Sequence, residues 1–221
     1  MNRVESLGFD SELFGYPTGK AILDSNSSLA EIKRQAESFR MVYLIADQEL
    51  NIEVSSVLLS GETVQFRKKV VPGFHSQTEV EVLKEMPNQA LLDLAFQSGV
   101  FSRFRVDSRL RGREFEKLYS LWLEKEFREG KVFVINKKQG LITVRVNEKK
   151  AEIGLFATDT QSRRLGLGTK LLRHLESYLW NLGVKELWVK TQRANEPALK
   201  FYLKNGFKEV ESRFIYHYWK E

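Results

Sequence analysis

The sequence predicts an α/β protein in which helices flank a mixed β-sheet. Short apolar runs of strand length alternate with longer amphipathic stretches of helical period along most of the chain. Two strand-like runs, 131–135 and 141–146, follow each other across a short connection, which predicts an antiparallel hairpin. A parallel doubly wound fold is excluded, because such a fold alternates strand and helix throughout.

A turn-rich stretch, residues 71–77, predicts a boundary between two parts of the chain. We expect a small N-terminal α/β domain over residues 1–75 and a larger domain over residues 76–221. In the first part we expect strands and helices in the order 20–23 (strand), 29–39 (helix), 41–46 (strand), 52–59 (short helix) and 63–67 (strand).

The larger part has strand and helix patterns in an order that continues to the end of the chain. We expect 78–83 (strand), 87–97 (helix), 115–123 (helix), the hairpin, 151–159 (strand), 171–182 (helix), 185–191 (strand), 195–205 (helix) and 211–219 (strand).

Composition excludes several classes of protein. The 221 residues are 42% hydrophobic and 29% charged, which is typical of an ordinary globular protein. The absence of cysteine excludes disulfides and thiolate metal sites, and three scattered histidines predict no metal. No apolar run approaches the roughly 18 residues of a membrane span, and the first residues lack a signal-peptide core, so we expect a cytoplasmic protein.

The chain is basic, with a net charge of +6 and a pI near 9.4. This charge suits either a nucleic-acid binder or a binder of small phosphorylated ligands. Acidic residues interrupt the basic runs, and no aromatic and basic platform resembles an RNA-binding motif. We therefore expect no nucleic acid and favour small phosphates.

One loop is a predicted anion site. Between the strand ending near Asp159 and the next helix stands Arg163-Arg164-Leu165-Gly166-Leu167-Gly168. The first N–H groups of a helix lack partners, glycine allows phosphate to approach the backbone, and arginine adds permanent charge. The spacing is neither the dinucleotide fingerprint nor the P-loop, and a tight structural connection is the alternative interpretation.

A second pattern follows the next strand. Asn195 is a predicted N-cap, and Tyr202 lies two helical turns further on, so both side chains lie on one helix face. Amphipathic packing alone is the alternative for Tyr202. Together the two patterns resemble the signatures of the GNAT N-acetyltransferase superfamily, and the number and order of elements are similar to its fold.

The resemblance implies an acetyl-CoA-dependent enzyme that transfers acetyl directly to an amine. It implies that the backbone at Leu155, Phe156 and Ala157 meets the thioester carbonyl, and that the loop from Arg163 to Gly168 binds pyrophosphate. It further implies that Asn195 contacts the CoA arm and that Tyr202 protonates the departing thiolate. The sequence identifies no general base.

A narrower resemblance concerns the acceptor. The segment from Leu7 to Tyr16 and the segment Ser102-Arg103-Phe104-Arg105 resemble nucleotide-aminosugar acetyltransferases of the dTDP-fucosamine kind, which serve surface polysaccharide synthesis. This implies a nucleotide-linked aminosugar acceptor, with Phe14, Arg103, Phe104 and Arg105 as substrate residues; a homodimer is one option for the assembly. The alternatives are a GNAT enzyme acting on a protein N-terminus or another small amine, and a noncatalytic acyl-CoA-binding module.

Overall fold

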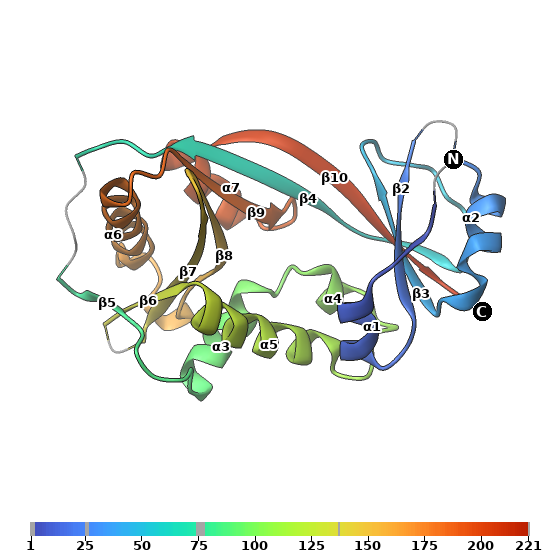
Figure 1. The fold of residues 1–221 in the computed structure, drawn as a ribbon, viewed down its shortest axis with the longest axis horizontal. Helices are drawn as coiled ribbons and strands as arrows, with labels where there is room; N and C mark the ends of the chain where they lie inside the picture. The colour runs from blue at the N-terminus through green and yellow to red at the C-terminus, as the bar shows by residue number, and fades with distance from the viewer. Residues whose placement is uncertain (1–2, 25–26, 74–77, 137, 221) are drawn as a thin grey trace.

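The computed structural model describes residues 3–24, 27–73, 78–136 and 138–220. Within these residues, ten strands form one sheet in the order β1-β2-β3-β10-β4-β9-β8-β7-β6-β5 (Figure 1). The strands are β1 (Glu5–Ser6), β2 (Thr18–Leu23), β3 (Met41–Ala46), β4 (Val57–Lys69), β5 (Val80–Val82), β6 (Lys131–Ile135), β7 (Gly140–Asn147), β8 (Lys150–Thr158), β9 (Glu186–Gln192) and β10 (Lys208–Trp219).

The sheet is mixed, as the sequence predicted. The neighbours β2 and β3 are parallel, as are β8 and β9, and the other neighbouring pairs are antiparallel. The predicted hairpin is confirmed as β6 and β7, which pair from Lys131↔Val144 to Ile135↔Gly140.

Helices cover both faces of the sheet. They are α1 (Gly8–Phe14), α2 (Leu29–Gln35), α3 (Gln89–Ser98), α4 (Arg103–Val106), α5 (Glu114–Glu129), α6 (Leu167–Asn181) and α7 (Glu196–Lys204), with short 3₁₀ turns at Ala36–Ser38 and Thr160–Ser162. One buried cluster joins α6 and α7 to the central strands, and a second joins α1, α3, α4 and α5 to the opposite face. A third cluster packs α2 on β2 and β3 at the N-terminal end of the sheet.

The position of β4 links the two predicted parts of the chain. This strand lies between β9 and β10, pairing from Thr63↔Gln192 to Lys69↔Glu186 on one side and with β10 along most of its length on the other. Figure 1 shows β4 and β10 running together along much of the molecule, toward the end formed by β2 and β3. The division at residue 75 stays a prediction, but its two parts share one sheet.

Two local expectations differ from the structure. The short helix expected over residues 52–59 is wrong: β4 begins at Val57 and pairs there with β10. The apolar residues here have a helix-like spacing, but pairing with β10 makes the segment a strand. The local sequence does not indicate this pairing, because the partner lies far away in the chain. The Ser102–Arg105 stretch, where no element was expected, begins the short helix α4, which is capped by the Ser102 hydroxyl; this hydroxyl accepts from the Phe104 N–H at 3.3 Å.

Candidate active site

The site is built where β8 and β9 separate. Their parallel pairing runs from Lys150↔Glu186 to Ile153↔Val189 and then stops, although β8 continues to Thr158 and β9 to Gln192. Beyond Ile153, β8 stays paired with β7 on its other side, up to Gly140↔Thr158. One edge of β8 therefore faces the opening with unpaired backbone groups, which can accept an extended ligand.

The direction of each N–H on this part of β8 follows from its neighbours. Leu155 donates to the Thr143 Oγ1 at 2.8 Å, and Asp159 donates to the Gln139 carbonyl at 2.8 Å, both toward the β7 side. Because successive N–H groups point to opposite edges of a strand, Ala157 also donates toward β7 and Phe156 points to the opening. Of the three residues expected to meet the carbonyl, only Phe156 thus directs its N–H to the opening, whereas Leu155 and Ala157 direct theirs to β7. Contact between the Phe156 N–H and a thioester stays a prediction.

The predicted anion loop opens helix α6 in a shape that suits an anion. Gly166 has φ +77° at the N-cap, and Arg164 has φ +64° before it. Within the described residues, no side chain caps this helix start, and Arg163 and Arg164 are exposed without an ion-pair partner. The loop therefore presents unpaired N–H groups and two cations on the surface.

Leu165 and Leu167, the other loop residues in that prediction, lie in different surroundings. The Leu165 side chain is 67% exposed, whereas that of Leu167 is buried in the cluster under α6. Gly168 faces the Phe201 ring: a β-carbon there would lie 3.4 Å from Phe201 Cε2. Leu167 thus anchors the helix start, and Gly168 keeps its side free of bulk.

Tyr202 lies deep beneath the opening. It is 5% exposed, and its ring lies among those of Phe66, Phe156, Phe201 and Phe207, with centroids 5.3 to 6.5 Å away. Its hydroxyl has no hydrogen-bond partner among the residues that the structure describes, and burial raises the pKa of this phenol. The group stays protonated at neutral pH, as a proton donor must.

Asn195 has a structural role. Its Oδ1 accepts from the Ala198 N–H at 3.3 Å and so caps α7, while its Nδ2 donates to the Thr191 Oγ1 at 3.4 Å. The cap is the one that the sequence predicted. Contact between Asn195 and the CoA arm stays a prediction.

Tyr202 and Asn195 line a cavity of about 190 Å³, which we call the inner cavity. It lies between α4 and α5 on one side and the ends of β8, β9 and α7 on the other. Its other lining residues include Thr63, Ser98, Phe101, Ser102, Arg103, Phe104, Leu118, Tyr119, Trp122, Ile153, Gly154, Leu155, Phe156, Val189, Lys190, Thr191, Gln192 and Ala198.

The four predicted substrate residues separate into two pairs. Arg103 and Phe104 line the inner cavity, where the Arg103 guanidinium lies 4.6 Å from the Tyr43 ring centre and 4.4 Å from that of Phe104. Phe14 is buried behind Phe104, with ring centres 5.7 Å apart, so it supports the wall. Arg105 is exposed and pairs with Glu116 at 3.4 Å, outside the lining of the cavity.

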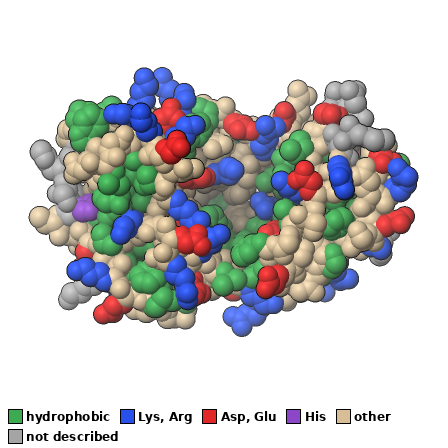
Figure 2. Space-filling view, in the orientation of Figure 1, with side chains coloured by type: hydrophobic (Ala, Val, Ile, Leu, Met, Phe, Trp, Pro, Cys, Tyr) green, Lys and Arg blue, Asp and Glu red, His purple; other side chains and the backbone are tan. Residues whose placement is uncertain are grey.

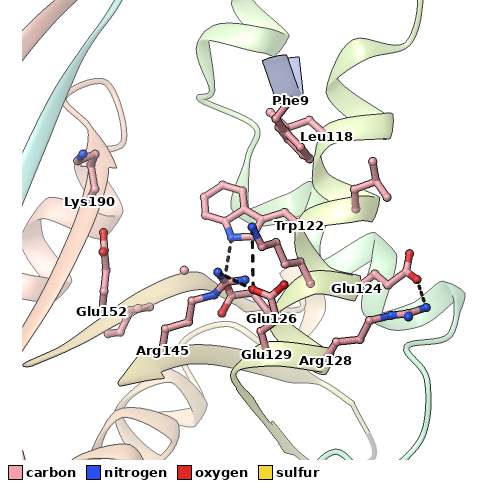
Figure 3. Close-up of a pocket in the computed structure, with 14 residues that line it drawn as sticks. Phe9, Leu118, Trp122, Glu124, Glu126, Arg128, Glu129, Arg145, Glu152 and Lys190 are labelled. Atoms are coloured by element: carbon pink, nitrogen blue, oxygen red, sulfur yellow. Dashed lines mark hydrogen bonds and ion pairs between the residues drawn. The ribbon is translucent and has the colours of Figure 1, made fainter. Parts of the chain in front are cut away.

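A larger groove of about 710 Å³, here called the outer groove, adjoins the inner cavity. The two share the lining residues Leu118, Trp122, Ile153, Gly154 and Lys190. Figure 3 shows Phe9, Leu118 and Trp122 on the α1 and α5 side of the outer groove and Glu152 and Lys190 on the strands opposite. In Figure 2 the molecule is hollowed near its middle, below β4 and β9 and above α5 of Figure 1.

A buried carboxylate lies at the floor of the outer groove. Glu126 Oε1 accepts from the Trp122 indole N–H at 3.1 Å and lies 2.8 Å from the Arg145 Nε (Figure 3). The sequence predicted a helix over residues 115–123 but indicated no role for Trp122 or Glu126, although their separation of four residues places both on one helix face.

Two buried titratable side chains, Asp107 and His217, contact each other, and Asp107 also contacts Trp219. Asp107 Oδ2 accepts from the Trp219 indole N–H and contacts His217 Nδ1, both at 2.8 Å. Burial lowers the pKa of His217 to about 4. Burial raises the pKa of Asp107, but hydrogen bonds from His217, Trp219 and Arg109 outweigh it and leave a net lowering. These groups hold β10 against the segment after α4.

The described residues offer neither a metal centre nor a membrane-spanning helix. They contain no cluster of three or more His, Asp or Glu side chains arranged to hold a metal ion. None of their helices has the length and apolar character needed to cross a bilayer.

Comparison with known proteins agrees with this geometry. Residues 103–207 match the model of the acetyltransferase (GNAT) family. An N-alpha-acetyltransferase of Sulfurisphaera tokodaii is 34% identical over 74 residues, 33% of this chain and 43% of that protein. The [ribosomal protein bS18]-alanine N-acetyltransferase of Escherichia coli (strain K12) is 38% identical over 62 residues, 28% of this chain and 42% of that protein.

This chain thus spans less than half the length of these curated relatives. A solved structure with similar architecture is a functionally unknown conserved protein from Staphylococcus epidermidis, with a TM-score of 0.63 and 11% identity. It covers 99% of this chain and 92% of its own. The family match thus covers residues 103–207, a little under half of the chain, and the solved structure shows a similar fold.

Proposed function

We propose that this chain is an acetyl-CoA-dependent N-acetyltransferase. The observation that carries the proposal is the separation of β8 and β9 above the inner cavity, with the Phe156 N–H on its edge and Tyr202 in its lining. A noncatalytic acyl-CoA-binding module would need the opening but not a protonated phenol beneath it.

The loop before α6 fits the pyrophosphate of CoA. Gly166 at φ +77° and Gly168 leave the backbone approachable, and the first N–H groups of α6 have no side-chain cap among the described residues. Arg163 and Arg164 would neutralise phosphate charge from the same loop. When bound, acetyl-CoA supplies an activated acetyl group as a thioester.

The residues of the site divide the chemistry among them. The Phe156 N–H would donate to the thioester carbonyl oxygen as negative charge gathers there. The amine nitrogen forms a bond to the carbonyl carbon as the carbon–sulfur bond breaks. Tyr202 would give its proton to the sulfur, and the proton lost by the amine restores the phenol through solvent. The products are an N-acetylated amine and free CoA thiol.

A nucleotide-linked aminosugar is the first proposed acceptor, from the resemblance of the N-terminal and Ser102–Arg105 segments. Arg103 supports it: this cation lines the inner cavity, and its Nε is buried with no hydrogen-bond partner among the described residues. The cation could pair with a phosphate. Phe104 beside it also lines the cavity, where a base or sugar ring would contact it.

A protein N-terminus is the second proposed acceptor. The outer groove favours it, because three of the cations that line it already have carboxylate partners: Arg128 with Glu124, Arg145 with Glu126 and Glu129, and Lys125 with Glu129. A groove with paired charges and an apolar wall suits a peptide better than a diphosphate. The names of the two curated relatives agree with this acceptor.

One assay distinguishes the two acceptors. The purified chain is incubated with acetyl-CoA and either dTDP- and UDP-aminosugars or short peptides with a free α-amine, and CoA thiol release is followed with a thiol-reactive dye. Acceptor-dependent release identifies the class. Tight acetyl-CoA binding without turnover on either panel or on simple polyamines would contradict the enzyme proposal.

A further inference from the structure

Strand β8 contains a bulge at the point where it leaves β9. The register with β7 shifts between Ile142↔Phe156 and Val144↔Ile153, so that Gly154 and Leu155 together lie opposite Thr143. The last β8–β9 pair is Ile153↔Val189, so the bulge begins at the residue where the opening begins.

The bulge depends on the absence of a side chain at Gly154. A β-carbon built there would lie 2.9 Å from Thr143 Oγ1 and 3.0 Å from both Glu126 Cδ and Oε1. The first contact is shorter than real β-carbons make and the other two are unusually tight, while the φ of Gly154 is not positive. Space, and not backbone conformation, therefore favours glycine at this position, since a larger residue would have to displace the Thr143 or Glu126 side chain.

Thr143 replaces the backbone partner that the bulge removes. Its side chain is fully buried, and its Oγ1 accepts the Leu155 N–H at 2.8 Å. Regular pairing with β7 resumes at Phe156 and Ala157. The hydroxyl thus holds Leu155 toward β7, and the alternation along the strand then directs the next N–H, that of Phe156, into the opening.

We propose that Thr143 is a positioning residue for acetyl transfer: its hydroxyl sets the strand alternation after the bulge and so directs the Phe156 N–H at the thioester carbonyl. Thr143 touches neither reactant, since it does not line the inner cavity or the outer groove. The expected effect on kcat rests on the proposed function. The expected direction of the Phe156 N–H rests on the backbone geometry alone.

Kinetics of folded variants test the proposal. Thr143→Val keeps the shape and removes the acceptor, and Thr143→Ser keeps the acceptor and removes the methyl group. Loss of one oxyanion donor typically lowers kcat by about 10²- to 10³-fold, so misdirecting it should lower kcat by about tenfold or more. KM for acetyl-CoA should change less, and Thr143→Ser should stay within about threefold of the parent.

Ser60→Ala is the matched control. Ser60 is also a buried hydroxyl between strands, donating to the Ile215 carbonyl at 2.8 Å, and it lies outside both lining sets. This variant should lose some stability and keep its kcat. A folded Thr143→Val protein with kcat within about threefold of the parent, or a Thr143→Ser protein as impaired as the valine variant, would overturn the assignment.

Amide hydrogen exchange on the unsubstituted protein tests the directions of the Leu155 and Phe156 N–H groups. It requires neither a variant nor enzymatic activity. The Leu155 amide should be protected without ligand, and the Phe156 amide should exchange rapidly and slow when acetyl-CoA is added. Equal protection of the two amides before addition would contradict the proposal even if Thr143→Val does not fold. Absence of turnover by the unsubstituted protein would contradict the proposed function and leave this exchange result to decide the role of Thr143.

Discussion

At the scale of single residues, the site depends on two glycines for different reasons, one for space and the other for backbone conformation. Gly154 leaves room for Thr143 and Glu126, whereas Gly166 supplies a left-handed backbone at the start of α6. The sequence predicted the second because a glycine pair before an amphipathic run is a local pattern. It could not predict the first, since the two side chains that crowd Gly154 come from β7 and α5.

Gly166→Val should weaken binding of CoA by about tenfold or more, since a β-branched residue both resists φ +77° and obstructs phosphate at the backbone. Isothermal titration with CoA measures this. Gly183→Val is the matched control: Gly183 has φ +73° just beyond the other end of α6, and a β-carbon added at either glycine would have no neighbouring atom within 4 Å. Unchanged affinity in a folded Gly166→Val protein would contradict the assignment of the loop.

At the scale of elements, β10 is fastened to the segment after α4 by a buried histidine. His217 is fully buried, its Nδ1 contacts Asp107, and its Nε2 has no hydrogen-bond partner within the described residues. Burial and the charges of Arg103 and Arg109 oppose protonation of the ring, and the contact with Asp107 favours it. The neutral ring is therefore the form that the folded protein holds.

This network predicts a loss of stability in mild acid. The pKa of His217 is about 4 in the folded chain and about 6.5 when unfolded, so the unfolded state gains a proton first as pH falls. Stability should be complete above pH 6.5 and decline toward pH 4, by up to about 3 kcal/mol at about 1.36 kcal/mol per pKa unit.

Urea unfolding between about pH 7.5 and pH 4 measures the loss, with His217→Gln as the comparison because glutamine does not titrate. The variant should be less stable at the upper end of this range and show a shallower decline. The same decline in both proteins would show that other groups cause it.

Elements with local signatures were predicted correctly, and the start of β4 at Val57, which depends on its pairing with β10, was not. The hairpin of β6 and β7 and the cap at Asn195 follow from neighbouring residues. The sequence did not indicate the role proposed for Thr143, because a threonine within Leu141–Val146 is compatible with any buried strand. The sequence also did not indicate that Trp122 and Glu126 line the outer groove, because an amphipathic helix pattern does not show which of its residues line a cavity.

At the scale of the whole molecule, the N-terminal part completes the sheet of the C-terminal part. Because β4 supplies hydrogen bonds to both β9 and β10, its removal would leave two long strands without a partner between them. The N-terminal part also supplies Phe9 to the outer groove and Tyr43 to the ring pair that holds Arg103. No local pattern in the sequence indicated the insertion of β4.

A chain of residues 76–221 alone should therefore fail to fold, as judged by circular dichroism and the absence of a cooperative thermal transition. A chain lacking only residues 1–6 is the control, because β1 is a two-residue edge strand that pairs with β2 alone. Cooperative unfolding of the 76–221 chain would contradict the structural role assigned to β4.

The proposed activity depends on Tyr202 as the group that protonates the leaving sulfur. Its side chain lines the inner cavity, and the four surrounding phenylalanine rings account for the packing of the ring but not for the hydroxyl. Tyr202→Phe removes that hydroxyl and keeps the rest of the side chain. Loss of a positioned acid typically lowers a rate by about 10²- to 10⁴-fold.

The most direct test is the steady-state kinetics of Tyr202→Phe with the acceptor that the thiol-release assay identifies. We expect kcat to fall within that range while KM for acetyl-CoA barely changes, because the lost interaction belongs mainly to the transition state. Thermal unfolding should confirm that the variant is folded. A folded Tyr202→Phe protein that keeps kcat within about threefold of the parent would contradict the role of Tyr202 as the acid.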